Sequence, residues 1–338
     1  MSDLVPTSSA ESESRTSLWL KWAILKTLRG FALLVGSSFI IYVTLRSAPG
    51  DVAELILGLS GTEEMKAALR QDFGLDNGLL FGYLKWAWRA LQGDLGLSIS
   101  FLPGAPVASI AGPAFLLTLT IACTSLMVSL CLAFSLTTLL GPPRSSEALF
   151  LGPLRLINAA PSFLISICIM KIINDFILWQ LSGGGQLPPS WYPLPVGREP
   201  SFAPFGFAIF AISLGDGLFT DTFNAVRAEL TGLNQSLFMN AVRARGASTW
   251  PHLLKNMIIP TLSIFTARLP LVLGAVVIVE YIFNLEGSGY VLLQAAQTRD
   301  VPVVVGVSIL FIVAVIVMNL ILDLVKSLVD PREIAKGE

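Results

Sequence analysis

The sequence predicts an all-α integral membrane protein with six transmembrane helices and a small extracytoplasmic helical segment after the first of them. Of its 338 residues, 54% are hydrophobic and 13% are charged, whereas soluble domains are about 25% charged. Leu95 to Pro143 and Val301 to Leu322 contain no Asp, Glu, Lys or Arg. A helix needs about 20 residues to cross the hydrocarbon core, and both runs are longer than that.

The N-terminal third divides into a tail, a span and a polar segment. Residues 1–17 are rich in Ser, Thr and Glu, which predicts a disordered tail, and residues 18–48 hold the first span. Residues 49–110 have a soluble character. Ser60 and Glu63 show capping-box spacing, which predicts a helix continuing to Phe73. Apolar residues at helical spacing from Leu79 to Ala87 predict a second helix that ends near Gly93. Together these helices should form a cap on the membrane surface.

The transmembrane core, residues 111–328, contains five further apolar stretches. They cover about 114–140, 156–179, 203–224, 262–283 and 302–325. The stretch at 203–224 is less apolar because Asp216 and Asp221 lie in its second half. The connector at 181–204 holds six Pro and four Gly, which predicts an irregular exposed loop. Residues 329–338 form the C-terminal tail.

The distribution of basic residues orients these six spans. Residues 1–29, residues 326–338 and the loops at 141–154 and 226–258 carry 12 of the 22 Lys and Arg residues. The opposite side carries 7, of which 4 belong to the long 52–110 segment, where the positive-inside rule has little force. The pattern therefore predicts that both termini and the 226–258 loop are cytoplasmic.

Composition also excludes several kinds of site. The single histidine, His252, leaves no histidine cluster for a metal, and no Gly-Lys pair is present to form a phosphate-binding loop. Cys123, Cys131 and Cys168 lie in apolar surroundings and are interpreted as small core residues. A net charge of −1 argues against a nucleic-acid partner. We expect no catalytic, cofactor-binding or metal site here, so any ATP would be bound by another chain.

The polar segment 226–258, between two apolar spans, is the most informative part of the chain. Leu230, Leu233, Leu237 and Ala241 recur at helical spacing, and Gly246 is placed to end that helix. Ser248 or Thr249 can cap the helix that follows. From the residues alone two interpretations stay open: a docking surface for a soluble partner, with Trp250, Leu253 and Leu254 filling a groove, or an amphipathic helix resting on lipid headgroups.

Three motifs in this segment resemble a known family. Arg227-Ala-Glu-Leu230, Val242-Arg-Ala-Arg-Gly-Ala-Ser248 and Leu253-Leu-Lys255 keep the spacing of the ATPase-coupling loop of ABC-transporter permeases, of the oligopeptide/dipeptide (peptide/nickel) type. Short matches in the same order extend the resemblance to the family's B-type subunit over residues 22–332: Ala48–Asp51, Phe73–Asp76, Gly93–Gly96, Pro161–Phe163, Glu280–Phe283, Gly287–Gly289, Arg299–Val304 and Asp330–Arg332. Asn256 and Glu286 depart from the family's usual His and Pro.

The resemblance implies a type I ABC importer fold and a coupling role for the loop. Gly246 would mark the bend, and residues 248–257 would form the short helix that seats in a cleft of the ATPase. The coupling residues implied are Arg227, Glu229, Ala241, Arg243, Ala244, Arg245, Gly246, Ser248, Trp250, Leu253, Leu254 and Lys255. The partners implied are two ATPase subunits that use ATP and Mg, a second homologous permease forming a heterodimer, an extracytoplasmic substrate-binding protein, and membrane lipid. The location implied is the bacterial cytoplasmic (inner) membrane.

A few polar or special residues lie within the spans. Asp216 is interpreted as a pathway residue or as a solvated residue near the cytoplasmic end of its helix, because a charge facing lipid costs a few kcal/mol. Glu280, near the outer end of the fifth span, is expected to have a structural or gating role, and Pro161 a kink. Lys171 and Asp175, four residues apart, should neutralise each other.

The leading hypothesis is therefore the permease subunit of a bacterial ABC importer for a peptide or similar small solute. Opines, metal chelates and oligosaccharides remain open as substrates. An ion-coupled secondary transporter is the alternative, although no inverted repeat is visible. A membrane enzyme would need a nucleophile–base pair or metal cluster that the spans do not supply.

Overall fold

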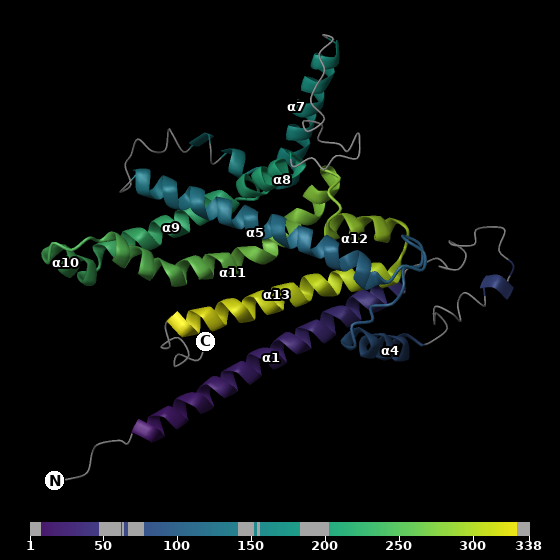
Figure 1. The fold of residues 1–338 in the computed structure, drawn as a ribbon, viewed down its shortest axis with the longest axis horizontal. Helices are drawn as coiled ribbons and strands as arrows, with labels where there is room; N and C mark the ends of the chain where they lie inside the picture. The colour runs from purple at the N-terminus through teal and green to yellow at the C-terminus, as the bar shows by residue number, and fades with distance from the viewer. Residues whose placement is uncertain are drawn as a thin grey trace.

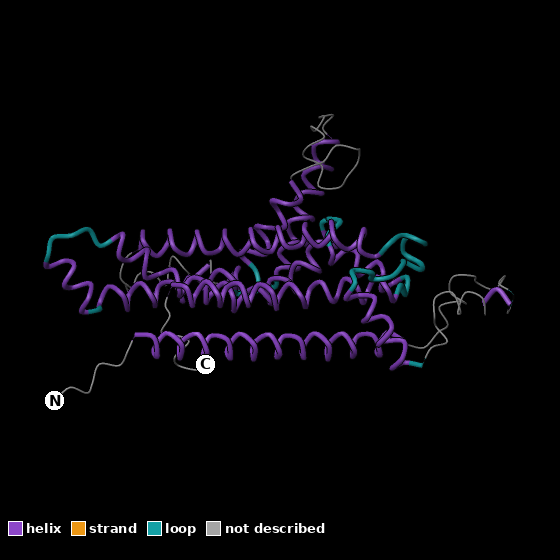
Figure 2. The backbone as a smooth tube through the Cα atoms, turned by 60° about the horizontal axis from the view of Figure 1, so that its bottom comes forward, coloured by secondary structure: helices purple, strands orange, loops and turns teal. Residues whose placement is uncertain are grey.

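The computed structural model describes residues 8–46, 62, 64–66, 78–140, 152–153, 156–182 and 203–329. Its helices are α1 (Ser8–Arg46), α4 (Leu79–Leu91), α5 (Val107–Leu140), α7 (Ser162–Ser182), α8 (Ala203–Leu214), α9 (Leu218–Gln235), α10 (Leu237–Ala244), α11 (Trp250–Ile282), α12 (Ser288–Gln297) and α13 (Val301–Val329). Within these ranges the only β pairing is an isolated bridge between Leu97 and Pro106 (Figure 2). The all-α class is confirmed.

The long helices lie side by side in an elongated bundle (Figure 1). Helix α5 packs against α8, α9 and α11, while α13 packs against α1, α11 and α12. The short helix α10 lies at one end of the bundle, and α4 and α12 lie at the other. Helix α7 contacts α8 and α11 and then leaves the bundle sideways, as both Figure 1 and Figure 2 show.

Five helices are long and apolar enough to cross a membrane: α1, α5, α7, α11 and α13. The pair α8 and α9 also passes when taken together, although it bends by 56° at the break between the two helices. The chain is thus a multi-pass membrane protein. The count of six depends on treating this bent pair as one span, so it stays a prediction.

The N-terminal part differs from the sequence prediction at one end. Helix α1 begins at Ser8, so residues 8–17, predicted to belong to a disordered tail, are helical. Helix α4 confirms the predicted helix that ends near Gly93. The proposed capping box at Ser60 and Glu63, and the helix end at Phe73, fall outside the described residues.

Two predicted spans differ more strongly. Pro161 was expected to kink the 156–179 span, but the helix breaks before it, and the Pro161 carbonyl accepts from Leu164 and Ile165 in the first turn of α7. The 203–224 span is broken at Gly215–Gly217, because Asp216 and Gly217 both have positive φ, 53° and 72°. Periodicity could not show this break, since the apolar pattern continues on both sides.

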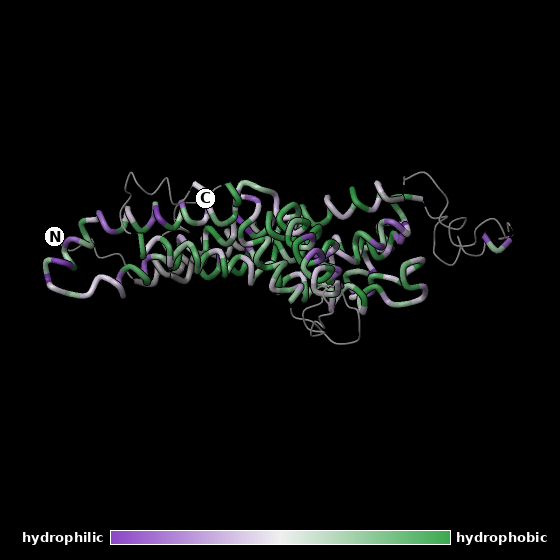
Figure 3. Tube along the Cα trace, turned by 90° about the horizontal axis from the view of Figure 1, so that it is seen from above, coloured by the Kyte–Doolittle hydropathy of each residue, from purple (hydrophilic) through white to green (hydrophobic). Residues whose placement is uncertain are grey.

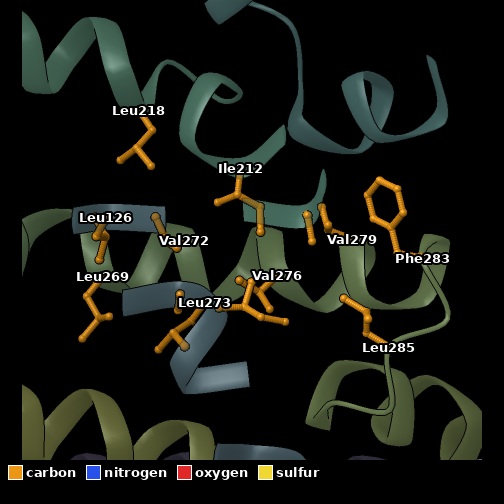
Figure 4. Packing of buried hydrophobic residues seen from close by; sticks show 13 residues of the cluster. Leu126, Ile212, Leu218, Leu269, Val272, Leu273, Val276, Val279, Phe283 and Leu285 are labelled. Atoms are coloured by element: carbon orange, nitrogen blue, oxygen red, sulfur yellow. The ribbon is translucent and has the colours of Figure 1, made fainter. Parts of the chain in front are cut away.

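A central apolar cluster joins α5, α8, α9 and α11 (Figure 4). Leu126, Ile212, Leu269 and Val276 are among its most buried members, each at most 1% exposed. A second cluster under α10 includes Phe219, Val226, Met239 and Leu253. Hydrophobic residues dominate the middle of the bundle, and polar residues gather at the α10 end (Figure 3).

Candidate coupling surface

The polar segment begins with a break between α9 and α10 at Ser236. This residue is extended, with φ −64° and ψ 147°, and its hydroxyl oxygen accepts from the Met239 amide at 3.3 Å, which caps α10. The Ser236 hydroxyl also donates to the Leu233 carbonyl at 2.7 Å. The sequence pattern predicted one helix through Leu230 to Ala241. That prediction is wrong, because the serine satisfies the backbone groups of both helix ends.

Helix α10 ends in a Schellman turn. The Gly246 amide donates to the Arg243 carbonyl at 2.9 Å, and the Ala247 amide donates to the Val242 carbonyl at 3.3 Å. Gly246 has φ 67° and no atom within 4 Å of the position a Cβ would occupy. The left-handed conformation therefore selects glycine here, not lack of space. The predicted role of Gly246 as helix terminator is confirmed.

Arg243 fixes α10 against the end of α9. Its guanidinium donates to the Asn234 carbonyl and to the Asn234 side-chain oxygen, both at 2.9 Å, and to the Asn240 side-chain oxygen at 3.2 Å. The buried side chains Met239 and Val242 hold the other face of α10 on the second apolar cluster. Arg243 therefore helps to hold α10 in place, a contact that spacing alone did not predict.

The outer face of this segment is apolar and basic. Leu237 is 87% exposed, and Phe238, Trp250 and Leu254 are each about half exposed. Other residues on the exposed part of the segment are Glu229, Ala241, Arg243, Ala244, Arg245, Ser248 and Lys255. Phe238 contacts His252 edge-to-face at 5.6 Å between ring centroids, which joins α10 to the start of α11.

Three sequence predictions for this surface are corrected. Residues 248–257 do not form a separate short helix, because from Trp250 onward they are the first turns of the continuous helix α11; the separate short helix is α10. Leu253 is 7% exposed and packs in the second cluster, so it cannot fill a partner's groove. Thr249 precedes α11, but its side chain makes no capping hydrogen bond. The exposed residues that the sequence analysis overlooked are Leu237 and Phe238.

Arg227 lies closer to the bundle than predicted. It is half-buried, and its guanidinium carbon lies 5.5 Å from the centre of the Phe223 ring, one turn earlier on α9. This cation–π contact anchors the helix that leads into the surface.

Glu280 lies at the opposite end of α11 in a buried network. It is fully buried, and its carboxylate accepts from the Thr118 hydroxyl at 2.6 Å and from the Gly289 amide at 2.8 Å. A Cβ on Gly287 would collide with this carboxylate, only 2.1 Å from its oxygen. The network ties α11 to α5 and α12. These contacts support a structural role for Glu280, which is one of the two roles, structural or gating, that the sequence predicts.

Asp300 makes a second such connection, which sequence reasoning missed. One of its carboxylate oxygens accepts from the Ser98 hydroxyl at 2.6 Å and from the amides of Ile99, Ser100 and Phe101 at 2.9–3.0 Å. The turn before α5 is thereby fixed to the start of α13. The motif around Arg299-Asp300 was the only signal available in sequence.

An all-α, multi-pass bundle with a rigid, exposed surface at one end is typical of a membrane subunit that works with soluble partners. The chain belongs to the family described as "Binding-protein-dependent transport system inner membrane component", whose profile matches residues 126–334, more than half of the sequence. It is therefore a permease subunit of a binding-protein-dependent ABC importer. Family membership does not favour the ion-coupled alternative.

Several relatives align over nearly the whole chain. A Brucella ovis protein named "putative peptide permease protein" is 27% identical over 326 residues, covering 93% of this chain and 98% of its own. The oligopeptide transport system permease protein AppB of Bacillus subtilis is 26% identical, and the glutathione transport system permease protein GsiC of Escherichia coli K12 is 25% identical. Each of these two alignments covers 92% of this chain and 98% of the relative. Importers of this family work with a substrate-binding protein and ATPase subunits.

Proposed function

We propose that α10, the Gly246 turn and the start of α11 form the surface on which an ATPase subunit docks, so that ATPase motion moves the spans of this permease. The observation that carries the proposal is the exposed apolar pair Leu237 and Phe238, on a helix fixed by Arg243 and ended by a Schellman turn. Large apolar side chains surrounded by basic residues are typical of docking surfaces. A rigid connection to α11 would pass a displacement into the bundle.

The remaining assignments follow from this role. Both termini and α10 would lie in the cytoplasm; in support, α1 begins and α13 ends toward the α10 side of the bundle (Figure 1). ATP and Mg would be bound and hydrolysed only by the partner ATPases, and this chain would carry out no chemistry. A second, homologous permease would complete the pathway. The solute would be a peptide or a similar small molecule, as the names of the relatives suggest.

The test is co-purification of the tagged chain with its complex from native membranes. We expect Leu237→Asp to release the ATPase subunits while the second permease stays bound, because a charged group would enter an apolar contact. Leu91→Asp is the matched control, since Leu91 is 71% exposed on α4 at the opposite end of the bundle. It should retain the ATPases.

Two results would contradict the proposal. The ATPases could remain bound to Leu237→Asp as firmly as to the wild type, which would mean that α10 is not their contact. Alternatively, Leu237→Asp could reduce the contact of α10 with liposome headgroups, read from a fluorophore on α10, without affecting ATPase binding, which would mean that α10 rests on lipid headgroups.

A further inference from the structure

Two breaks in the helices meet at one place in the bundle. The chain is non-helical just before α7 and again between α8 and α9, and the two breaks are joined by backbone hydrogen bonds. The Asp216 amide donates to the Ala160 carbonyl at 3.0 Å, and the Gly217 amide donates to the Asn158 carbonyl at 2.8 Å. A Cβ on Gly215 would lie 2.5 Å from Cα of Ser162. The two breaks therefore pack directly against each other, and we treat them as one junction.

This junction lies near the middle of the bundle. Leu218, at the start of α9, belongs to the central apolar cluster with Ile121 and Leu126, which lie midway along α5. Arg268 on α11 is followed by Leu269 of the same cluster and is 14 residues, or about 21 Å, from the helix end at Ile282. Non-helical backbone at such a depth is tolerated only inside protein or along a water-filled cavity.

Charged and unsatisfied polar groups gather at the junction. Asp221 forms an ion pair with Arg268 at 2.9 Å, and its carboxylate lies beside Gly217. Asp216 is exposed, and its carboxylate forms no hydrogen bond or ion pair with the described part of the chain. Asn158 is 1% exposed; its side-chain oxygen accepts from the Thr220 amide, but its side-chain nitrogen has no partner among the described residues.

These groups cannot face lipid without a cost of several kcal/mol. Because Arg268 already neutralises Asp221, the charge left over is that of Asp216. We propose that Asp216, with the Asp221–Arg268 pair and Asn158 beside it, forms a polar subsite of the translocation pathway that binds a cationic group, an ammonium or guanidinium, of the passing solute. The inference rests on the proposed function and assigns the substrate class for which this subsite is suited.

The first test measures cation preference without needing the natural substrate. Thr220→Cys, on a background in which Cys123, Cys131 and Cys168 are replaced by Ser, would be labelled in the assembled complex. The reagents are a cationic and an anionic membrane-impermeant methanethiosulfonate, with rates normalised to those of a free thiol. We expect faster cationic labelling, and a fall of about fivefold in the cation-to-anion ratio when Asp216→Asn is added. Asp175→Asn is the control, because Asp175 pairs with Lys171 on α7, and it should leave the ratio unchanged.

The second test measures transport by the same complex in proteoliposomes with its binding protein. Asp216→Asn should lower the ratio of trilysine uptake to trialanine uptake below that of the wild type. Both complexes are measured with the same binding protein, so any preference of that protein cancels from the comparison. Labelling of the isolated subunit but not of the complex would overturn the inference, because the second permease would then cover Asp216. So would a ratio that Asp216→Asn leaves unchanged. If ATP hydrolysis changes the labelling rates but the complex takes up neither peptide, only the assignment of peptides as the substrate is refuted.

Discussion

Thr118 on α5 donates a hydrogen bond of 2.6 Å to the Glu280 carboxylate on α11, although the two residues are 162 positions apart in the chain. The Thr118 hydroxyl also lies 2.7 Å from the Ser288 hydroxyl and accepts from the Ser288 amide at 2.8 Å. Three helices are therefore joined by one buried network, and its removal has consequences for the whole bundle.

Glu280→Ala should lower the thermal unfolding temperature of the detergent-solubilised protein by several degrees. The change removes the acceptor of the buried Gly289 amide, and an unsatisfied buried group costs about 1–3 kcal/mol. The Thr118 hydroxyl keeps only the Ala114 carbonyl, at 3.1 Å, and the Ser288 hydroxyl as partners. The matched control is Glu286→Ala, because Glu286 is exposed in the loop that follows α11. Equal unfolding temperatures for the two variants, measured by size-exclusion after heating, would contradict a structural role for Glu280.

Asp300→Ala should loosen the turn before α5. Four donors converge on one Asp300 oxygen, so its loss frees the amides of residues 99–101 together. We expect their hydrogen-exchange rates to rise at least tenfold in a peptide-resolved measurement. Exchange in α10, at the opposite end of the bundle, should not change; a rise there of the same size would point to general unfolding.

The pair Arg89–Asp94 predicts a local pH dependence. The hydrogen bond from the Arg89 side chain, followed by that from the Gly96 amide, lowers the pKa of Asp94 below its ordinary value of 3.8. A lowered pKa in the folded state means that the stabilisation is present above the ordinary value and is lost as the pH falls through the folded value. The Gly96 amide should therefore keep its hydrogen-exchange protection as the pH falls through 3.8, the ordinary aspartate value, and lose it only at lower pH, after correction for the intrinsic exchange rate.

In the Asp94→Asn variant, this pH dependence should be absent. A wild-type protein that loses Gly96 protection at or above the ordinary aspartate pKa would contradict the predicted direction of the shift.

Gly246→Ala should reduce ATPase-coupled transport, whereas Gly246→Asn should retain most of it. Open space surrounds the missing Cβ, so the penalty is the left-handed backbone alone, about 1 kcal/mol for Ala and less for Asn. Gly232→Ala is the control, because Gly232 lies inside α9 with ordinary φ and an equally open Cβ position. Similar transport by the Ala and Asn variants at position 246 would show that the turn geometry is not what coupling requires.

The sequence predicted the fold class and the termination at Gly246 because charge-free runs and a glycine after a periodic helix are local signals. It did not predict the breaks at Ser236 and Asp216. The break at Asp216 depends on hydrogen bonds that only the folded chain supplies, such as the bond from Asp216 to Ala160. The break at Ser236 is made by local bonds to Leu233 and Met239, but the apolar periodicity that continues across it concealed it. Burial of Leu253 and exposure of Leu237 were likewise beyond periodicity, because both positions are apolar and only the placement of α10 separates them. The sequence singles out Glu280 because it is a charged residue within a span, but it does not identify Thr118 and Ser288 as its partners.

Helix α11 runs without interruption from the Gly246 turn to the Glu280 network, 33 residues or about 50 Å. A body of that length acts as a lever: Trp250 lies 30 residues, or about 45 Å, from Glu280, so each degree of tilt about the buried carboxylate displaces Trp250 by about 0.8 Å. A small tilt that leaves the packing around Glu280 intact would thus move the end of α11 at Trp250 by several ångströms. Because Pro260 and Pro270 lie inside this helix and lack a backbone N–H donor, bending at these two residues, together with helix length, sets how the movements of its two ends are related.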